Sequence, residues 1–175
     1  MGFMRDSSGF SLIELIVVVA IVAIIATIAL PRLKKPDVRV VFLKKLNALT
    51  ELGYTQALAT GQMQRLFFDF TKKTVTLESA QQERSAAGEV VYKPTNINYL
   101  KTAIEWPQEF ELRSFYINEK VDPGTITTIY FIIMPQGFTQ RVVITILDTV
   151  KDDTFIVVLN PFYAQFEVQD EASKA

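Results

Sequence analysis

The feature that most constrains this chain is an apolar block near its N-terminus. Residues 10–30 read FSLIELIVVVAIVAIIATIAL, a run of 21 residues whose only polar members are Ser11, Glu14 and Thr27. At about 1.5 Å per residue, a helix of this length spans roughly 30 Å, the thickness of a bilayer's hydrocarbon core. β-branched residues are frequent in the block, but buried strands do not run this far. We therefore expect a membrane-spanning helix over residues 10–30.

Such a segment has three competing interpretations: a plain signal anchor, a secretory signal peptide cleaved near Ala29, or the helix by which a filament subunit assembles. The apolar core of a secretory signal peptide is only about 7–15 residues long and gives way to small polar residues, whereas this block stays apolar to Leu30. The positive-inside rule places the side that carries Arg32, Lys34 and Lys35 in the cytoplasm. A filament subunit has the opposite orientation, so the charge rule conflicts with that interpretation.

A short motif decides between these interpretations. After a polar leader, Met1 to Ser8, residues 9–15 read GFSLIEL. This motif resembles the prepilin peptidase site of type IV pilins and of the pseudopilins of type II secretion. The resemblance implies cleavage between Gly9 and Phe10, N-methylation of Phe10, and a glutamate, Glu14, at the fifth mature position. Pro31 matches the proline that interrupts the helix in that family.

Glu14 is an ionisable residue inside an apolar helix, which costs about 2.5–3.5 kcal/mol at a bilayer centre and less near its edge. Its carboxylate can extend to the interface or pair with the amine of its own Phe10, four residues earlier. Alternatively, it can meet the Phe10 ammonium of a neighbouring subunit and fix the register between helices. With the motif intact we favour the last interpretation, which makes Phe10 and Glu14 the assembly residues.

A second helix is expected beyond the prolines. Apolar residues recur at helical spacing through Phe42, Leu46 and Leu49, which is typical of a half-buried helix from Asp37, a plausible N-cap, to Thr60, with Gly61 as its stop. Pro36 departs from the usual family pattern, and together with Pro31 it should bend or unwind the helix, because each proline removes a backbone donor. The expected organisation is therefore a leader (1–9), a transmembrane assembly helix (10–30), its amphipathic second half (31–61) and a β-rich periplasmic head (62–175).

Strand patterns and turn residues fill the rest of the chain. The expected strands are Arg65–Phe70, Thr74–Glu78, a brief Glu89–Tyr92, Phe110–Asn118, Ile126–Met134, Arg141–Leu147, Thr154–Leu159 and Ala164–Val168. Residues 79–98 otherwise read as polar and irregular, and Asp122-Pro123-Gly124 is a strong turn signal. Strands that follow a helix with no further helix between them predict an α+β fold, a type IV pilin-like long helix packed on an antiparallel sheet.

The head has a second resemblance, to the GspH/FimT-type minor pseudopilins. Trp106-Pro107 precedes a strand, and Ile129–Met134 leads into Pro135-Gln136-Gly137. The last segment, from Asn160 to Val168, lies where that family often has a closing strand that contains glycine. Ala164 replaces the glycine here, which is a departure from the pattern.

Catalysis and metal binding have little support in the sequence. The chain has no cysteine and no histidine, which removes disulfides, most metal centres and most nucleophile–base pairs. Asp148, Asp152 and Asp153 could together ligate calcium, but the EF-hand spacing is absent and charged residues are ordinary at a hairpin tip. Glu109 and Glu111 are expected on the solvent side of a strand. We therefore expect no enzyme, no cofactor and no metal.

Aromatic residues are mostly expected in the core, since they fall in strands: Phe67, Phe68, Phe70, Phe115, Tyr116, Tyr130 and Phe131. Phe162, Tyr163 and Phe166 form either core or an edge patch for a partner.

The resulting hypothesis is a structural subunit, a minor pseudopilin at or near the tip of a type II secretion pseudopilus in the bacterial inner membrane. Its implied partners are other pseudopilins or pilins, the prepilin peptidase and the inner-membrane assembly platform. The alternative is a minor pilin of a type IV or DNA-uptake pilus, FimT-like. DNA binding is disfavoured, because the chain from Pro36 onward carries more acidic than basic residues.

Overall fold

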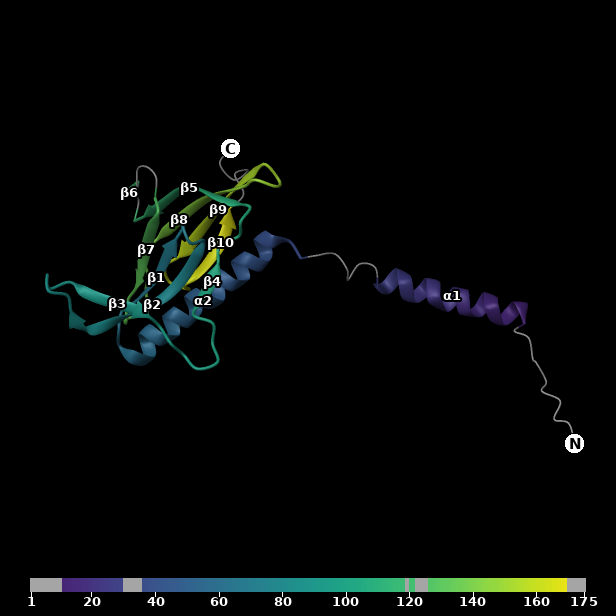
Figure 1. The fold of residues 1–175 in the computed structure, drawn as a ribbon, viewed down its shortest axis with the longest axis horizontal. Coiled ribbons are helices and arrows are strands. Elements are labelled where there is room, and N and C mark those ends of the chain that lie inside the picture. The colour runs from purple at the N-terminus through teal and green to yellow at the C-terminus, as the bar shows by residue number, and fades with distance from the viewer. Residues whose placement is uncertain (1–10, 30–35, 119, 122–125, 170–175) are drawn as a thin grey trace, which may run out of the picture. The chain divides into compact units, whose positions relative to one another are not determined.

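The computed structural model describes residues 11–29, 36–118, 120–121 and 126–169 (Figure 1). The chain divides into two compact units, Met1–Asp37 and Val38–Ala175. We describe each unit by itself.

The first unit contains one helix, α1 (Leu12–Ala29). Its sequence is a run of apolar residues without glycine or proline, so nothing interrupts the backbone hydrogen bonds. Its large apolar side chains are exposed, from Val18 at 47% to Leu12 at 77%. Among the residues that the structure describes, no helix combines the length and the apolarity needed to cross a membrane.

The second unit begins with α2 (Val38–Thr60). Phe42, Leu46, Leu49 and Ala57 are buried on one face, as the helical spacing predicts. The helix ends where Gly61 adopts a left-handed φ of 66° and donates its N–H to the Ala57 carbonyl at 3.0 Å. The expected amphipathic helix is confirmed to within one residue at its start.

Two antiparallel sheets form the head behind α2. The first sheet has the strand order β3-β2-β1-β7, with β4 also paired to β2. Its strands are β1 (Gln64–Asp69), β2 (Thr74–Arg84), β3 (Val90–Pro94), β4 (Ala103–Glu105) and β7 (Thr128–Ile133).

The second sheet has the order β10-β9-β8-β5-β6. Its strands are β5 (Phe110–Ile117), β6 (Lys120–Val121), β8 (Val142–Asp148), β9 (Asp153–Asn160) and β10 (Gln165–Gln169). Along β8 the residues alternate between buried and half-buried, because one face meets the core and the other faces solvent.

The core lies where α2 meets both sheets. α2 contacts β1, β2, β4 and β7 of the first sheet and β10 of the second. Edge-to-face aromatic pairs connect α2 and the two sheets. The distances between ring centroids are 5.2 Å for Phe42 and Trp106, 5.2 Å for Phe68 and Phe115, and 5.6 Å for Phe42 and Phe110. The Trp106 indole N–H donates to the Phe110 carbonyl at 2.9 Å, so this buried ring leaves no unpaired donor.

The α+β class is confirmed, with α2 packed on antiparallel sheets, but three details of the expected strands are wrong. The strands form two sheets where one was expected, and the strands around residues 110–117 and 128–133 belong to different sheets. β4 was missed. Residues 79–84, expected to be irregular, continue β2 and pair with β3 as a ribbon. The ribbon escaped prediction because nearly all of its residues are half-buried or exposed, so that they need no strict alternation of apolar side chains. The turn signal at residues 122–124 lies outside the described residues.

Candidate assembly surfaces

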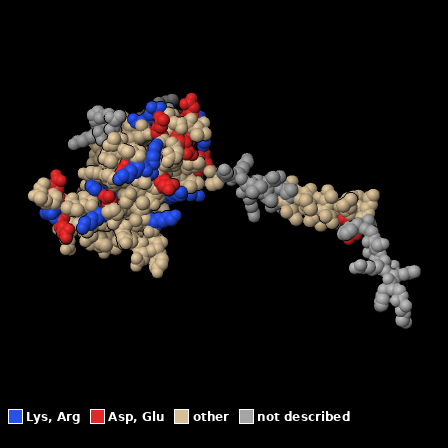
Figure 2. Space-filling view, viewed as in Figure 1, with Lys and Arg blue, Asp and Glu red and all other residues tan. Residues whose placement is uncertain are grey.

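The start of α1 has a defined cap. The Ser11 Oγ accepts a hydrogen bond from the Glu14 N–H at 3.3 Å, and the Ser11 carbonyl accepts from Glu14 at 3.0 Å and Leu15 at 3.2 Å. Ser11 and Glu14 thus occupy the N-cap and third helical positions of a capping-box sequence, Ser-x-x-Glu. A carboxylate here also lies at the positive end of the helix dipole. Figure 2 shows α1 without charge except near this end.

The other predicted N-terminal residues fall largely outside the described part of the chain. Gly9, Phe10 and Pro31 are not among the described residues, so the cleavage site stays a prediction. Pro36 is exposed and non-helical, two residues before α2 begins. This position is compatible with an interruption at Pro36, while the joint role of the two prolines also stays a prediction.

The first turn of α2 is tied to the β8–β9 turn by Arg39. Its Nε donates to Asp148 Oδ2 at 2.9 Å, and its Nη1 donates to Asp153 Oδ2 at 2.8 Å. The guanidinium also lies over the Phe155 ring, 4.7 Å from its centroid. Asp148 is buried and accepts two backbone N–H bonds as well, from Val150 at 3.2 Å and Lys151 at 3.1 Å.

Burial by itself raises the pKa of Asp148, but the Arg39 guanidinium and these backbone donors outweigh it and hold the pKa below its ordinary value. The carboxylate is therefore charged and saturated with donors at neutral pH.

Two of the three aspartates considered as calcium ligands instead pair with a cation of the chain itself. Asp148 and Asp153 face Arg39, while Asp152 is exposed at the turn with a φ of 50°. Within the described residues, no group of three acidic, histidine or cysteine side chains is placed to hold a metal ion. Glu109 precedes β5 instead of lying in it, so its expected strand position is wrong, whereas Glu111 is exposed as expected.

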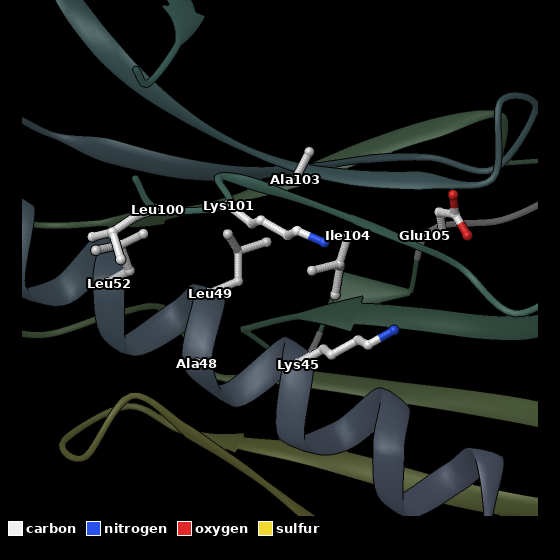
Figure 3. Close-up of a pocket in the computed structure, with 9 residues that line it drawn as sticks. All are labelled: Lys45, Ala48, Leu49, Leu52, Leu100, Lys101, Ala103, Ile104 and Glu105. Carbon is white, nitrogen blue, oxygen red and sulfur yellow. The ribbon is translucent and has the colours of Figure 1, made fainter. Parts of the chain in front are cut away.

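A groove of about 510 Å³ runs between α2 and the segment that contains β4. Figure 3 shows Leu49 and Leu52 of α2 facing Leu100 and Ile104 across it. Lys45, Lys101 and Glu105 also line the groove. Both signs of charge and apolar walls suit a protein segment better than a small anion.

The outer face of the first sheet carries an aromatic cluster around Arg65. The Arg65 Nε donates to Glu78 Oε2 at 2.6 Å. The rings of Phe67, Tyr92 and Tyr130 lie 5.3, 4.2 and 4.8 Å from its guanidinium carbon. Phe67 and Tyr130 were expected in the core, and Tyr130 is instead 45% exposed, because odd-numbered residues of β7 take the inner face. Burial raises the pKa of Tyr92 above its ordinary value.

The three C-terminal aromatic residues, for which the sequence left core and surface open, differ in burial. Phe166 is buried against Phe131, with centroids 6.0 Å apart. Phe162 and Tyr163 are each 74% exposed at the β9–β10 turn. Ala164, which stands where the resemblance suggested a glycine, has a left-handed φ of 50°, the backbone conformation that glycine adopts without strain.

Comparison with known proteins found a family match for the N-terminal segment and a similar fold for most of the chain. The family described as "Prokaryotic N-terminal methylation motif" matches residues 4–30. Two solved structures of the minor pseudopilin EpsH from the type 2 secretion system of Vibrio cholerae are similar, each with a TM-score of 0.50. One is 11% identical and covers 74% of this chain and 94% of its own; the other is 10% identical and covers 73% and 90%. A comparison with curated protein sequences found no match.

The N-terminal segment thus carries a prokaryotic methylation motif, and the region behind it has the fold of a minor pseudopilin. At 10–11% identity the structural similarity establishes the fold alone. The similar structures are pseudopilins, which are structural subunits.

Sequence reasoning missed the roles of Ser11 and Arg39, whereas the aromatic turn at Phe162 and Tyr163 was one of two alternatives that it left open. Ser11 had a readable signal, since serine three residues before glutamate at a helix start is a capping box. Arg39 had none, because its partners lie more than a hundred residues away.

Proposed function

We propose that this protein is a minor pseudopilin, a structural subunit at or near the tip of a type II secretion pseudopilus. The observation that carries the proposal is the combination of a methylation motif over residues 4–30 with a head of the EpsH-like fold. Neither feature alone would suffice, because the motif is shared with pili and the fold similarity is remote.

In this proposal residues 1–9 are a leader that prepilin peptidase removes between Gly9 and Phe10, after which Phe10 is N-methylated. Residues 10–30 anchor the chain as a single pass in the bacterial inner membrane, residues 31–61 continue the helix, and residues 62–175 form the head on the periplasmic side. Other pilin-like subunits and the inner-membrane assembly platform are the partners.

Assembly would proceed by moving the apolar helix from lipid into a bundle of like helices. α1 suits this step, because its described large apolar side chains are exposed, from 47% at Val18 to 77% at Leu12. A lone carboxylate in such a bundle is costly unless a cation meets it. Cleavage before Phe10 would create such a cation, the N-terminal ammonium, in every subunit. In the filament, the ammonium of a neighbouring subunit would meet Glu14.

The first test is the mass of the mature N-terminus. The full chain is produced in cells with prepilin peptidase, and its N-terminal peptide is analysed by mass spectrometry. We expect a peptide that begins with N-methylated Phe10. A mature chain that retains residues 1–9, or starts elsewhere, would contradict the proposal.

The second test separates the two roles open to Glu14, helix capping and pairing between subunits. Glu14→Gln keeps a side chain that can accept a hydrogen bond but removes the charge, whereas Ser11→Ala removes the capping hydroxyl and keeps the charge. If Glu14 pairs with a neighbouring ammonium, Glu14→Gln lowers the filament-associated fraction by about tenfold or more, since a lost charge pair is worth at least ~1.4 kcal/mol.

Ser11→Ala is the matched control. We expect it to reduce incorporation by much less, because the N-cap stabilises the helix of a single subunit both before and after assembly. Methylation of Phe10 is measured in both variants, so that a processing defect is not mistaken for an assembly defect. Equal losses in the two variants would show that Glu14 acts only as part of the cap.

A further inference from the structure

The head has two ends, which α2 defines. The end at Val38 is where the first unit joins, and Arg39 ties the β8–β9 turn to it. The other end, at Thr60, is the distal end. There the β7–β8 turn lies against the last turns of α2, since a Cβ on Gly137 would lie 2.8 Å from the Tyr54 hydroxyl and 3.2 Å from Leu58 Cδ2.

The β9–β10 turn lies beside the β7–β8 turn at this distal end. The Thr139 N–H donates to the Pro161 carbonyl at 3.1 Å, which joins the two turns. Tyr163 and Leu58 line one groove of about 570 Å³ with Tyr54. The two turns and the end of α2 therefore form one continuous surface.

This surface exposes large apolar side chains. Phe162 and Tyr163 are each 74% exposed, Leu58 is 51% exposed and Phe138 is 48% exposed. We call these four residues the distal patch. Single exposed apolar residues are ordinary, but four that share a surface, three of them aromatic, have the composition of a protein interface.

The distal patch also lacks charge. Residues 134–140 (MPQGFTQ) and 160–166 (NPFYAQF), which make up the two turns, contain no acidic or basic residue. Elsewhere on the visible face of the head, charges of both signs are intermingled (Figure 2). Glu51 is the charged residue that lines the adjoining groove.

The opposite end of the head, near Val38, exposes charged side chains. The β8–β9 turn there exposes Val150, followed by the exposed charged residues Lys151, Asp152 and Asp153. Lys72, in the β1–β2 turn, is also exposed. Burying these charges against an uncharged patch would remove their hydration without supplying partners, which is unfavourable.

We propose that the distal patch is the docking surface for the head of a different pilin-like subunit, one that presents an uncharged apolar surface to it. This inference rests on the proposed function, because it assumes that all subunits enter the assembly by their N-terminal helices in one orientation. In that arrangement, a second copy of this chain would offer its charged end to the patch. The charge mismatch selects a different chain as the partner.

The test uses the full chain, produced in cells that carry the rest of its assembly machinery. Tyr163 is replaced by the photocrosslinking amino acid p-benzoylphenylalanine, and the matched control carries it at Val150, equally exposed at the opposite end. After irradiation, the adducts are identified by mass spectrometry, and methylation of Phe10 is measured in the same cells. We expect an adduct at position 163 with a chain that has its own prepilin motif, and no adduct with that chain from position 150.

Several outcomes would overturn the inference. An adduct that joins two copies of this chain through position 163, or an adduct with a protein that lacks the motif, assigns the patch to another occupant. A methylated chain that enters the filament without any adduct at 163 shows that the patch is free, and the proposed function then stands. A chain without methylated Phe10 contradicts the proposed function and this inference together.

Substitution gives a second measurement that does not depend on crosslinking. The double variant Phe162→Ser, Tyr163→Ser should lower the filament-associated fraction by about tenfold or more, as loss of an aromatic interface anchor does. Val150→Ser should leave that fraction unchanged. The thermal midpoint of the double variant is expected to match the unmodified chain, because both rings are exposed; an unchanged filament fraction would contradict the proposal.

Discussion

At the scale of single residues, Asp148 shows how a buried charge is held in this head. It is 3% exposed and accepts hydrogen bonds from Arg39 and from two backbone N–H groups of its own turn. Its pKa is held below the ordinary value. A depressed pKa means that the folded state gains stability from the ionised carboxylate above about pH 4, the ordinary range for Asp, and loses that gain as pH falls through the folded pKa.

We therefore predict that Asp148→Asn lowers the free energy of unfolding at pH 7 by about 2 kcal/mol, because Arg39 loses its buried partner. Thermal unfolding followed by circular dichroism at pH 7 and at pH 2.5 tests this. The gap between the variant and the unmodified chain should shrink at pH 2.5. Asp152→Asn, at the exposed tip of the same turn, is the control and should change little at either pH.

Asn47 is a second residue whose role only the structure reveals. Its side chain donates to the Phe166 carbonyl at 3.0 Å and accepts from the Phe166 N–H at 2.6 Å. The amide thus takes the place of a neighbouring strand along the outer edge of β10, and α2 covers that edge.

Asn47→Leu should cost about 2–3 kcal/mol, since two half-buried backbone groups lose their partners. The measurement is the midpoint of urea denaturation. Ala48→Leu, an exposed position on the same helix, is the comparison and should be nearly neutral. A midpoint for Asn47→Leu as high as that of the comparison would show that solvent satisfies β10 equally well.

At the scale of elements, the close approach of α2 to the first sheet depends on Gly53. A Cβ at this buried position would lie 2.8 Å from both Ile133 Cδ1 and Leu77 Cδ1. Those side chains come from β7 and β2, so the helix rests directly on the middle of the sheet.

Gly53→Val should therefore destabilise the head by about 1–3 kcal/mol through overpacking. Ala48→Val carries the same helix-propensity cost of valine at an exposed position of α2, which makes it the matched control. Both are compared by thermal midpoint. Equal shifts in the two variants would mean that the sheet yields to the added methyl groups.

The elements also show where sequence patterns are sufficient. α2 was predicted to within a residue because Phe42, Leu46 and Leu49 repeat at helical spacing and Gly61 ends the helix. The division of strands between two sheets was not predicted. Alternation along a strand reports that one face is buried, but it does not report which strand lies alongside.

At the scale of the whole molecule, the core belongs to the second unit. Every member of the hydrophobic cluster lies between Phe42 and Phe166. The first unit ends at Asp37, before that cluster begins.

We accordingly predict that removing residues 1–36 leaves a head that folds by itself. Its thermal midpoint should lie within about 2 °C of that of the full chain in detergent, because no core residue is lost. Calorimetry on both proteins gives the comparison. A large fall in the midpoint, or a fragment without cooperative unfolding, would show that the first unit contributes to the fold of the head.

The sequence by itself determined what the chain's N-terminal segment is. A methylation motif is a local run of residues, so the match over residues 4–30 needs no fold to be read, and the helical spacing of α2 is equally local. Tertiary structure decided which aromatic rings are core and which are surface. Phe162 and Phe166 are four residues apart and chemically identical, yet one is 74% exposed and the other 3%. Burial depends on what covers a side chain, and for Phe166 the cover includes Phe131 of the other sheet, which no local pattern can specify.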